Sequence, residues 1–67
     1  MNERSQRERI ARHLLSGKAI TALEALKRFG CLRLSGRIYE LKHEGMNIGK
    51  QMVMRGEKRV ASYYYAD

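Results

Sequence analysis

Apolar residues recur at helical spacing in three successive segments of the chain. Residues three or four positions apart lie on one face of an α-helix, so each segment predicts an amphipathic helix with one buried side. The three sets are Ile10 with Leu14, then Leu23 with Leu26 and Phe29, and finally Leu34 with Ile38 and Leu41.

Capping signals set the limits of the first predicted helix. Ser5 with Glu8 matches a capping box, and Gly17 follows the last apolar residues, so we expect a helix from about Gln6 to Ser16. Residues 1–4 contain little apolar surface to hold them and are expected to be frayed.

The second and third predicted helices are joined by a tight turn. Thr21 and Glu24 form another candidate capping box, and Gly30 stands where a left-handed residue would end the second helix. The third helix contains the apolar set from Leu34 to Leu41 and closes at Gly45. Two helices joined by a glycine-containing turn have the plan of a helix-turn-helix.

After Gly45 the apolar residues alternate, as they do in β-strands. We predict a hairpin from residues 46–54 and 60–65, with Gly56 and Glu57 as its two turn residues. That turn pairs Met54 with Arg59, Met52 with Ala61, Lys50 with Tyr63 and Ile48 with Tyr65. Residues 18–20 can add a short strand at the sheet edge.

The same register sorts the hairpin side chains between two faces. The face expected on the helices contains Ile48, Met52, Ala61, Tyr63 and Tyr65. The outer face contains Gln51, Val53, Val60, Ser62 and Tyr64, of which Val53, Val60 and Tyr64 offer a contact for a homodimer or for neighbouring copies.

Three helices, a short strand and a C-terminal hairpin predict one α+β domain over residues 5–67, a winged helix whose wing is the hairpin. Charge extends this expectation to a partner. The chain has 14 Lys and Arg against 7 Asp and Glu, a net charge of +7 and a pI near 10.1. Such an excess favours a polyanion, and double-stranded DNA first.

Several other classes find little support. No apolar run is long enough for a membrane span, and the charged start lacks a signal-peptide core, so we expect a cytoplasmic protein. The single Cys31 fits a reducing compartment and a buried thiol. His13 and His43 have no partners at catalytic or metal-binding spacing, so we expect no enzyme, cofactor, metal or small-molecule substrate.

The outward side of the third helix holds the main candidate DNA contacts, because the N-terminal part of this helix enters the major groove in a helix-turn-helix. Arginine can bind guanine with two hydrogen bonds, so Arg33 and Arg37 are candidates for a base edge or a phosphate. For Arg37 an ion pair with Glu40 or Glu44 is the alternative. The full candidate set is Arg33, Ser35, Gly36, Arg37, Tyr39 and Glu40.

The wing and the motif's flanks supply further basic candidates. Arg55, Lys58 and Arg59 would meet the DNA backbone or the minor groove from the wing tip. Lys18, Lys27 and Arg28 are secondary phosphate candidates. Lys27 and Arg28 also suit the C-terminus of a helix without any ligand, because cations there interact favourably with the macrodipole.

The run TALEALKRFG-CLRLSGRIYELKHEG-MNI, followed by a hairpin ending RVASYYY, resembles the small phage- and prophage-associated helix-turn-helix domains of winged-helix type. The likeness spans Ser5 to Tyr65 and is most specific over CLRLSGRIYELKHEG. It implies a winged-helix fold and a DNA-binding role in phage regulation. Gly36 departs from the pattern, because many relatives would have a better helix former there.

The leading hypothesis is therefore a sequence-specific or architectural DNA-binding protein, a small phage-type regulator or recombination accessory. The alternative is a protein-binding winged helix that acts as an inhibitor or adaptor of a host protein. RNA binding ranks last, because the chain lacks the stacked-aromatic sheet motif of RNA-recognition domains.

Overall fold

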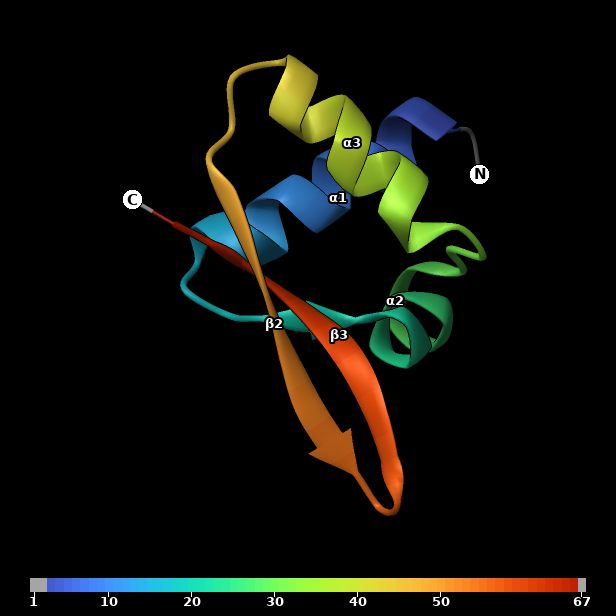
Figure 1. The fold of residues 1–67 in the computed structure, drawn as a ribbon. Coiled ribbons are helices and arrows are strands. Elements are labelled where there is room, and N and C mark those ends of the chain that lie inside the picture. Colours follow the sequence, from blue (N-terminus) through green and yellow to red (C-terminus); the bar gives the residue numbers. More distant parts are fainter. Residues whose placement is uncertain (1–2, 67) are drawn as a thin grey trace.

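The computed structural model describes residues 3–66, which form three helices and a three-stranded antiparallel sheet. The helices gather at one end of the molecule, and the hairpin of the last two strands extends away from them (Figure 1). This arrangement confirms the α+β winged-helix prediction. The elements are α1 (Glu3–Leu15), β1 (Ile20–Thr21), α2 (Ala22–Phe29), α3 (Leu34–His43), β2 (Ile48–Arg55) and β3 (Lys58–Tyr65).

The first helix starts earlier than the sequence predicted. α1 begins at Glu3, so the backbone of Ser5 lies inside the helix and the predicted start near Gln6 is wrong. Glutamate and arginine are good helix formers, and Glu3 and Arg4 extend the helix by their propensity. The expectation of a frayed segment over residues 1–4 falls partly on residues 1–2, which lie outside the described residues.

Both ends of α2 have the predicted caps. The Glu24 N–H donates to Thr21 Oγ1 at 3.3 Å, and the Thr21 N–H donates to Glu24 Oε1 at 3.1 Å, which completes the capping box. At the other end Gly30 has a φ of 65°, and its N–H donates to the Leu26 carbonyl at 3.0 Å. These bonds satisfy backbone groups that the helix itself leaves unpaired.

The buried face of α2 differs from the predicted one. Ala25 is fully buried and Phe29 half-buried, whereas Leu23 is 60% exposed and Leu26 44% exposed. The predicted stripe of Leu23, Leu26 and Phe29 is therefore wrong. Ala25 and Phe29 set the inner face, and at 3.6 residues per turn Leu23 points roughly 160° away from Ala25.

The core joins all three helices to β1. Leu34, Ile38 and Leu41 are buried on α3, as their spacing predicted. They form one cluster with residues of α1, β1, the α2–α3 turn and β2, and the thiol of Cys31 is buried there as expected. The other buried members of the cluster are Ile10, Leu14, Ile20, Ala25 and Ile48.

The hairpin register is confirmed at every predicted pair. Met54 faces Arg59 and Ile48 faces Tyr65, with the turn at Gly56 and Glu57. Gly56 has a φ of 65°, while no described non-glycine residue has a positive φ, which fits a type II′ turn with glycine first. The predicted edge strand also forms: Ile20 pairs with Tyr63, so the sheet order is β1-β3-β2.

The predicted division of the hairpin into an inner and an outer face holds only in part. Ile48 is buried, but Met52 is 49% exposed and Tyr65 is also exposed, so their inward assignment is wrong. Ser62, assigned outward, is only 4% exposed. The hairpin extends beyond the helices, which leaves Met52 uncovered, and Ser62 lies on the central strand between Gln51 and Thr21 (Figure 1).

Candidate nucleic-acid interface

The outer face of α3 is open to solvent where the sequence placed it. Ser35, Gly36, Tyr39 and His43 are all exposed. The Tyr39 hydroxyl lies 2.8 Å from His43 Nε2, and the two rings meet edge to face. Apart from its chain neighbours and the nearby backbone of α3, an added Cβ at Gly36 would meet no atom of the described residues within 4 Å. Packing therefore does not require glycine at this position.

The N-terminus of α3 differs from that of α2. Arg33 occupies the N-cap position, is exposed, and within residues 3–66 makes no capping hydrogen bond with its side chain. The first N–H groups of a helix have no intrahelical acceptor and give this end a partial positive charge. The start of α3 thus combines an exposed arginine, Ser35 and the positive end of a helix.

Arg37 points toward α1 rather than outward. Its Nη1 lies 2.8 Å from Glu40 Oε1, and its Nε donates to Gln6 Oε1 at 3.0 Å. The ion pair with Glu40, which the sequence left open as an alternative, is present. A second pair, Arg7 with Glu44 at 3.0 Å, joins α1 to the C-cap residue of α3. Arg37 and Glu40 are both half-buried, and they fix the side of α3 that faces α1.

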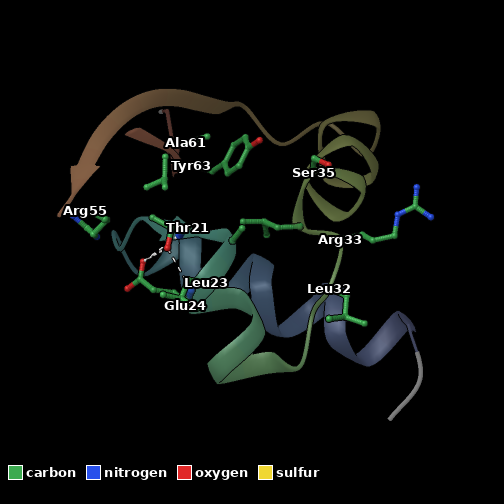
Figure 2. A pocket seen from close by; sticks show the side chains of 12 residues that line it. Thr21, Leu23, Glu24, Leu32, Arg33, Ser35, Arg55, Ala61 and Tyr63 are labelled. Carbon is green, nitrogen blue, oxygen red and sulfur yellow. Dashed lines mark hydrogen bonds between the residues drawn. The ribbon is translucent and has the colours of Figure 1, made fainter. Parts of the chain in front are cut away.

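A groove of about 460 Å³ lies between α2, the start of α3 and the wing. Thr21 lines it from the end of β1, Leu23 from the start of α2, Ser35 from α3, and Ala61 and Tyr63 from β3 (Figure 2). Figure 2 shows Arg55 and Arg33 at its opposite ends, with the Arg33 side chain directed away from the cavity. Most of this lining is apolar, so the groove differs from the polar outer face of α3.

A second hollow, of about 240 Å³, lies between α3 and the base of the wing. Ser35, Tyr39 and Lys42 line it from α3, and Lys50 and Tyr63 line it from the hairpin. Lys42 and Lys50 are exposed and were not among the candidates. The sequence contained a signal for both: Lys42 is seven residues after Ser35 on the same helical stripe, and Lys50 is paired with Tyr63 in the predicted register.

The remaining basic candidates are exposed on three different elements. Arg55, Lys58 and Arg59 flank the hairpin turn, and Arg55 Nη1 donates to the Met54 carbonyl at 3.3 Å. Lys18 lies in the loop before β1, whereas Lys27 and Arg28 end α2. The structure places the wing residues on a projecting tip, separate from the secondary candidates of α2.

No helix within residues 3–66 is long and apolar enough to cross a membrane. Over the same residues, no group of three or more His, Cys, Asp and Glu side chains is arranged to hold a metal ion.

Comparison with known proteins identifies a family. The family of winged helix-turn-helix domains matches residues 5–67, nearly the whole chain. No curated protein and no solved structure matches the sequence. Winged helix-turn-helix domains are typically non-enzymatic DNA-binding modules, so the match indicates DNA binding in general terms. Because the match extends over the helices and the wing alike, the chain belongs to the winged helix-turn-helix domain family.

Proposed function

We propose that the protein binds double-stranded DNA with the outer face of α3 in the major groove and the wing on the adjacent backbone. One observation carries the proposal: Ser35, Tyr39 and Lys42 of α3 and Lys50 of the wing line the same hollow. Polar and basic groups from both elements therefore converge on one side of a protein with a net charge of +7. A duplex is the polyanion whose groove admits a helix and whose phosphates lie on either side of it.

Within this interface, Arg33 and Ser35 are the proposed base contacts, because they stand exposed at the start of α3. Gly36 allows the duplex to approach the helix backbone, and the Tyr39 hydroxyl donates to a phosphate. Arg37 and Glu40 act as positioning residues, since Arg37 pairs with Glu40 and donates to Gln6, which holds α3 against α1.

The wing and the flanking cations are proposed to contact phosphates. Arg55, Lys58 and Arg59 project from the hairpin tip, where charge meets the backbone without a fixed base partner. Lys42 and Lys50 join this set because they line the hollow between helix and wing. Lys18, Lys27 and Arg28 are secondary contacts on the flanks of the motif.

The test is a fluorescence-anisotropy titration of labelled duplex DNA at several salt concentrations. If about four to six cations reach phosphates, the slope of log K against log salt is roughly −4 to −5, because each neutralised phosphate releases counterions. An affinity that stays flat from low to physiological salt contradicts the proposal and puts the protein-binding alternative, an inhibitor or adaptor of a host protein, in first place.

The narrower roles remain predictions of the sequence: a small phage or prophage regulator, or a recombination accessory. Self-association through Val53, Val60 and Tyr64 also remains a prediction. A single module offers only roughly 600–1,000 Å² to DNA, so neighbouring copies would add specificity. Mass measurements at high protein concentration, with and without DNA, test this point, and a monomer in both conditions contradicts it.

A further inference from the structure

The outer edge of β3 is only partly covered. β2 pairs with β3 along its whole length, whereas β1 pairs with it only at Tyr63 and Ser62. Within residues 3–66 the edge formed by residues 58–61 therefore faces no strand. In an antiparallel ladder that begins with the pair of Arg55 and Lys58, the N–H and C=O groups of Arg59 point toward this open edge, while those of Ala61 face Ala22 at the start of α2.

The open edge of β3 borders the groove of about 460 Å³. Val60 and Ala61 line the groove from β3, and Leu23, which is 60% exposed, lines it from α2. An added strand places alternate side chains on opposite faces of the sheet, so its apolar residues can pack beside Leu23 while its backbone pairs with β3. The groove and the edge together have the two features of a strand-addition site.

Charge decides which strand fits. Arg55 lines the groove, and Lys58 and Arg59 lie on the open edge itself. The acidic residue of the lining, Glu24, already accepts hydrogen bonds from Thr21 in the capping box. Antiparallel pairing of β3 with its counterpart in a second copy would bring Lys58 and Arg59 close to like charges, which is destabilising.

We propose that this groove binds an extended acidic segment of a partner protein, added to the sheet as a strand antiparallel to β3. Its backbone pairs with Arg59, its acidic side chains lie near Arg55 and Lys58, and an apolar side chain packs on Leu23. The site is additional to the proposed DNA interface. Because Arg55 and Lys58 belong to both, the acidic segment and DNA exclude each other, so an acidic partner would release the protein from DNA.

The experiment uses an octapeptide of alternating glutamate and valine, titrated into the ¹⁵N-labelled full chain and followed by NMR. We expect saturable shifts of the Arg59 amide and its neighbours, and slower exchange of the Arg59 amide proton with solvent. Leu23→Ser weakens peptide binding about tenfold, because the apolar contact is worth at least 1.4 kcal/mol. Leu26→Ser, on the same helix but outside the groove lining, is the matched control and leaves binding unchanged.

Two further peptides separate charge from backbone pairing. An octapeptide of alternating lysine and valine should not bind, and a glutamate–valine peptide methylated on alternate backbone nitrogens should bind weakly. The proposal is overturned if no glutamate–valine peptide binds, if the lysine peptide binds equally well, or if Leu26→Ser weakens binding as much as Leu23→Ser. It is also overturned if Leu23→Ser abolishes a self-association of the protein, since the occupant is then a second copy.

A competition assay tests the exclusion of DNA separately. Addition of the glutamate–valine peptide should displace labelled duplex at the concentration at which it saturates the amide shifts. Peptide binding without displacement contradicts the shared site but leaves DNA binding intact. Peptide binding in a protein that does not bind DNA contradicts the proposed function and leaves the strand-addition site standing.

Discussion

The two helices of the helix-turn-helix are held in place in different ways. α2 spans Ala22–Phe29, has a full capping box and a glycine cap, and among its residues only Ala25 is fully buried. α3 spans Leu34–His43, lacks a side-chain cap at its start in the described structure, and buries Leu34, Ile38 and Leu41. The stability of α2 thus depends on the caps at its ends, whereas the stability of α3 depends on the buried residues of its inner face.

This difference explains what each helix can offer to a partner. α3 is anchored by its core residues and by Arg37, so its exposed outer face needs no side chain for stability. α2 leaves Leu23 and Leu26 exposed, and its first turn instead borders an apolar groove. The polar surface suits DNA and the apolar one suits a protein segment.

The largest expected effect contrasts one apolar residue from each helix. Ile38→Ala should destabilise the fold by about 2–5 kcal/mol, because Ile38 is 3% exposed and its loss leaves a cavity. Leu26→Ala should cost less than about 1 kcal/mol, because much of that side chain is already in water. Denaturant unfolding of both variants measures this contrast in the free energy of unfolding. Equal losses of that free energy would mean that α2 contributes as much to the core as α3.

The second prediction compares the two N-caps. Thr21→Ala removes the side-chain acceptor of the Glu24 N–H and should destabilise the fold by about 1 kcal/mol. Arg33→Ala removes a side chain that makes no cap bond within the described chain, so its effect should stay within about 0.5 kcal/mol. Thermal melts of the two variants decide the matter. A larger loss for Arg33→Ala would show that α3 also depends on its N-cap.

The third prediction concerns Gly36. Its substitution should change stability least, and the change should be a gain rather than a loss. Gly36→Ala should stabilise the fold by up to about 1 kcal/mol, because the methyl group meets no described atom within 4 Å and alanine favours the helix. The same variant should weaken DNA binding, since the added group lies on the surface proposed to meet the duplex. A variant that gains stability and keeps full DNA affinity would remove Gly36 from the interface.

Local signals predicted most of the fold. The capping box at Thr21, the glycine cap at Gly30 and the hairpin register around Gly56 depend on residues close in sequence, and all three are confirmed. The start of α1 lies before the predicted one because helix propensity extends the helix beyond the Ser5–Glu8 pattern to Glu3. The exposure of Leu23 could not be predicted, since it depends on how closely α2 approaches the rest of the core.

The candidate site likewise has features that local patterns predict and features that they do not. The exposed positions of α3 followed from the apolar spacing, whereas the orientation of Arg37 depends on Gln6, which lies 31 positions away in the chain. No local pattern indicates such a contact. Lys42 lies on the predicted third helix and Lys50 on the predicted hairpin. Only the hollow that both residues line shows that the two elements meet there.

The most direct test of the central claim compares Arg33→Ala with Lys58→Ala on a duplex obtained by selection and on a scrambled one. Arg33→Ala removes the α3 contact and should reduce the binding free energy at the selected site by about 1–3 kcal/mol. It should also reduce discrimination between the two duplexes. Loss of the wing contact should weaken both complexes equally and make the salt slope shallower by about one unit. The reverse pattern would exchange the two roles. If neither variant changes the affinity for either duplex, α3 and the wing are not the DNA interface.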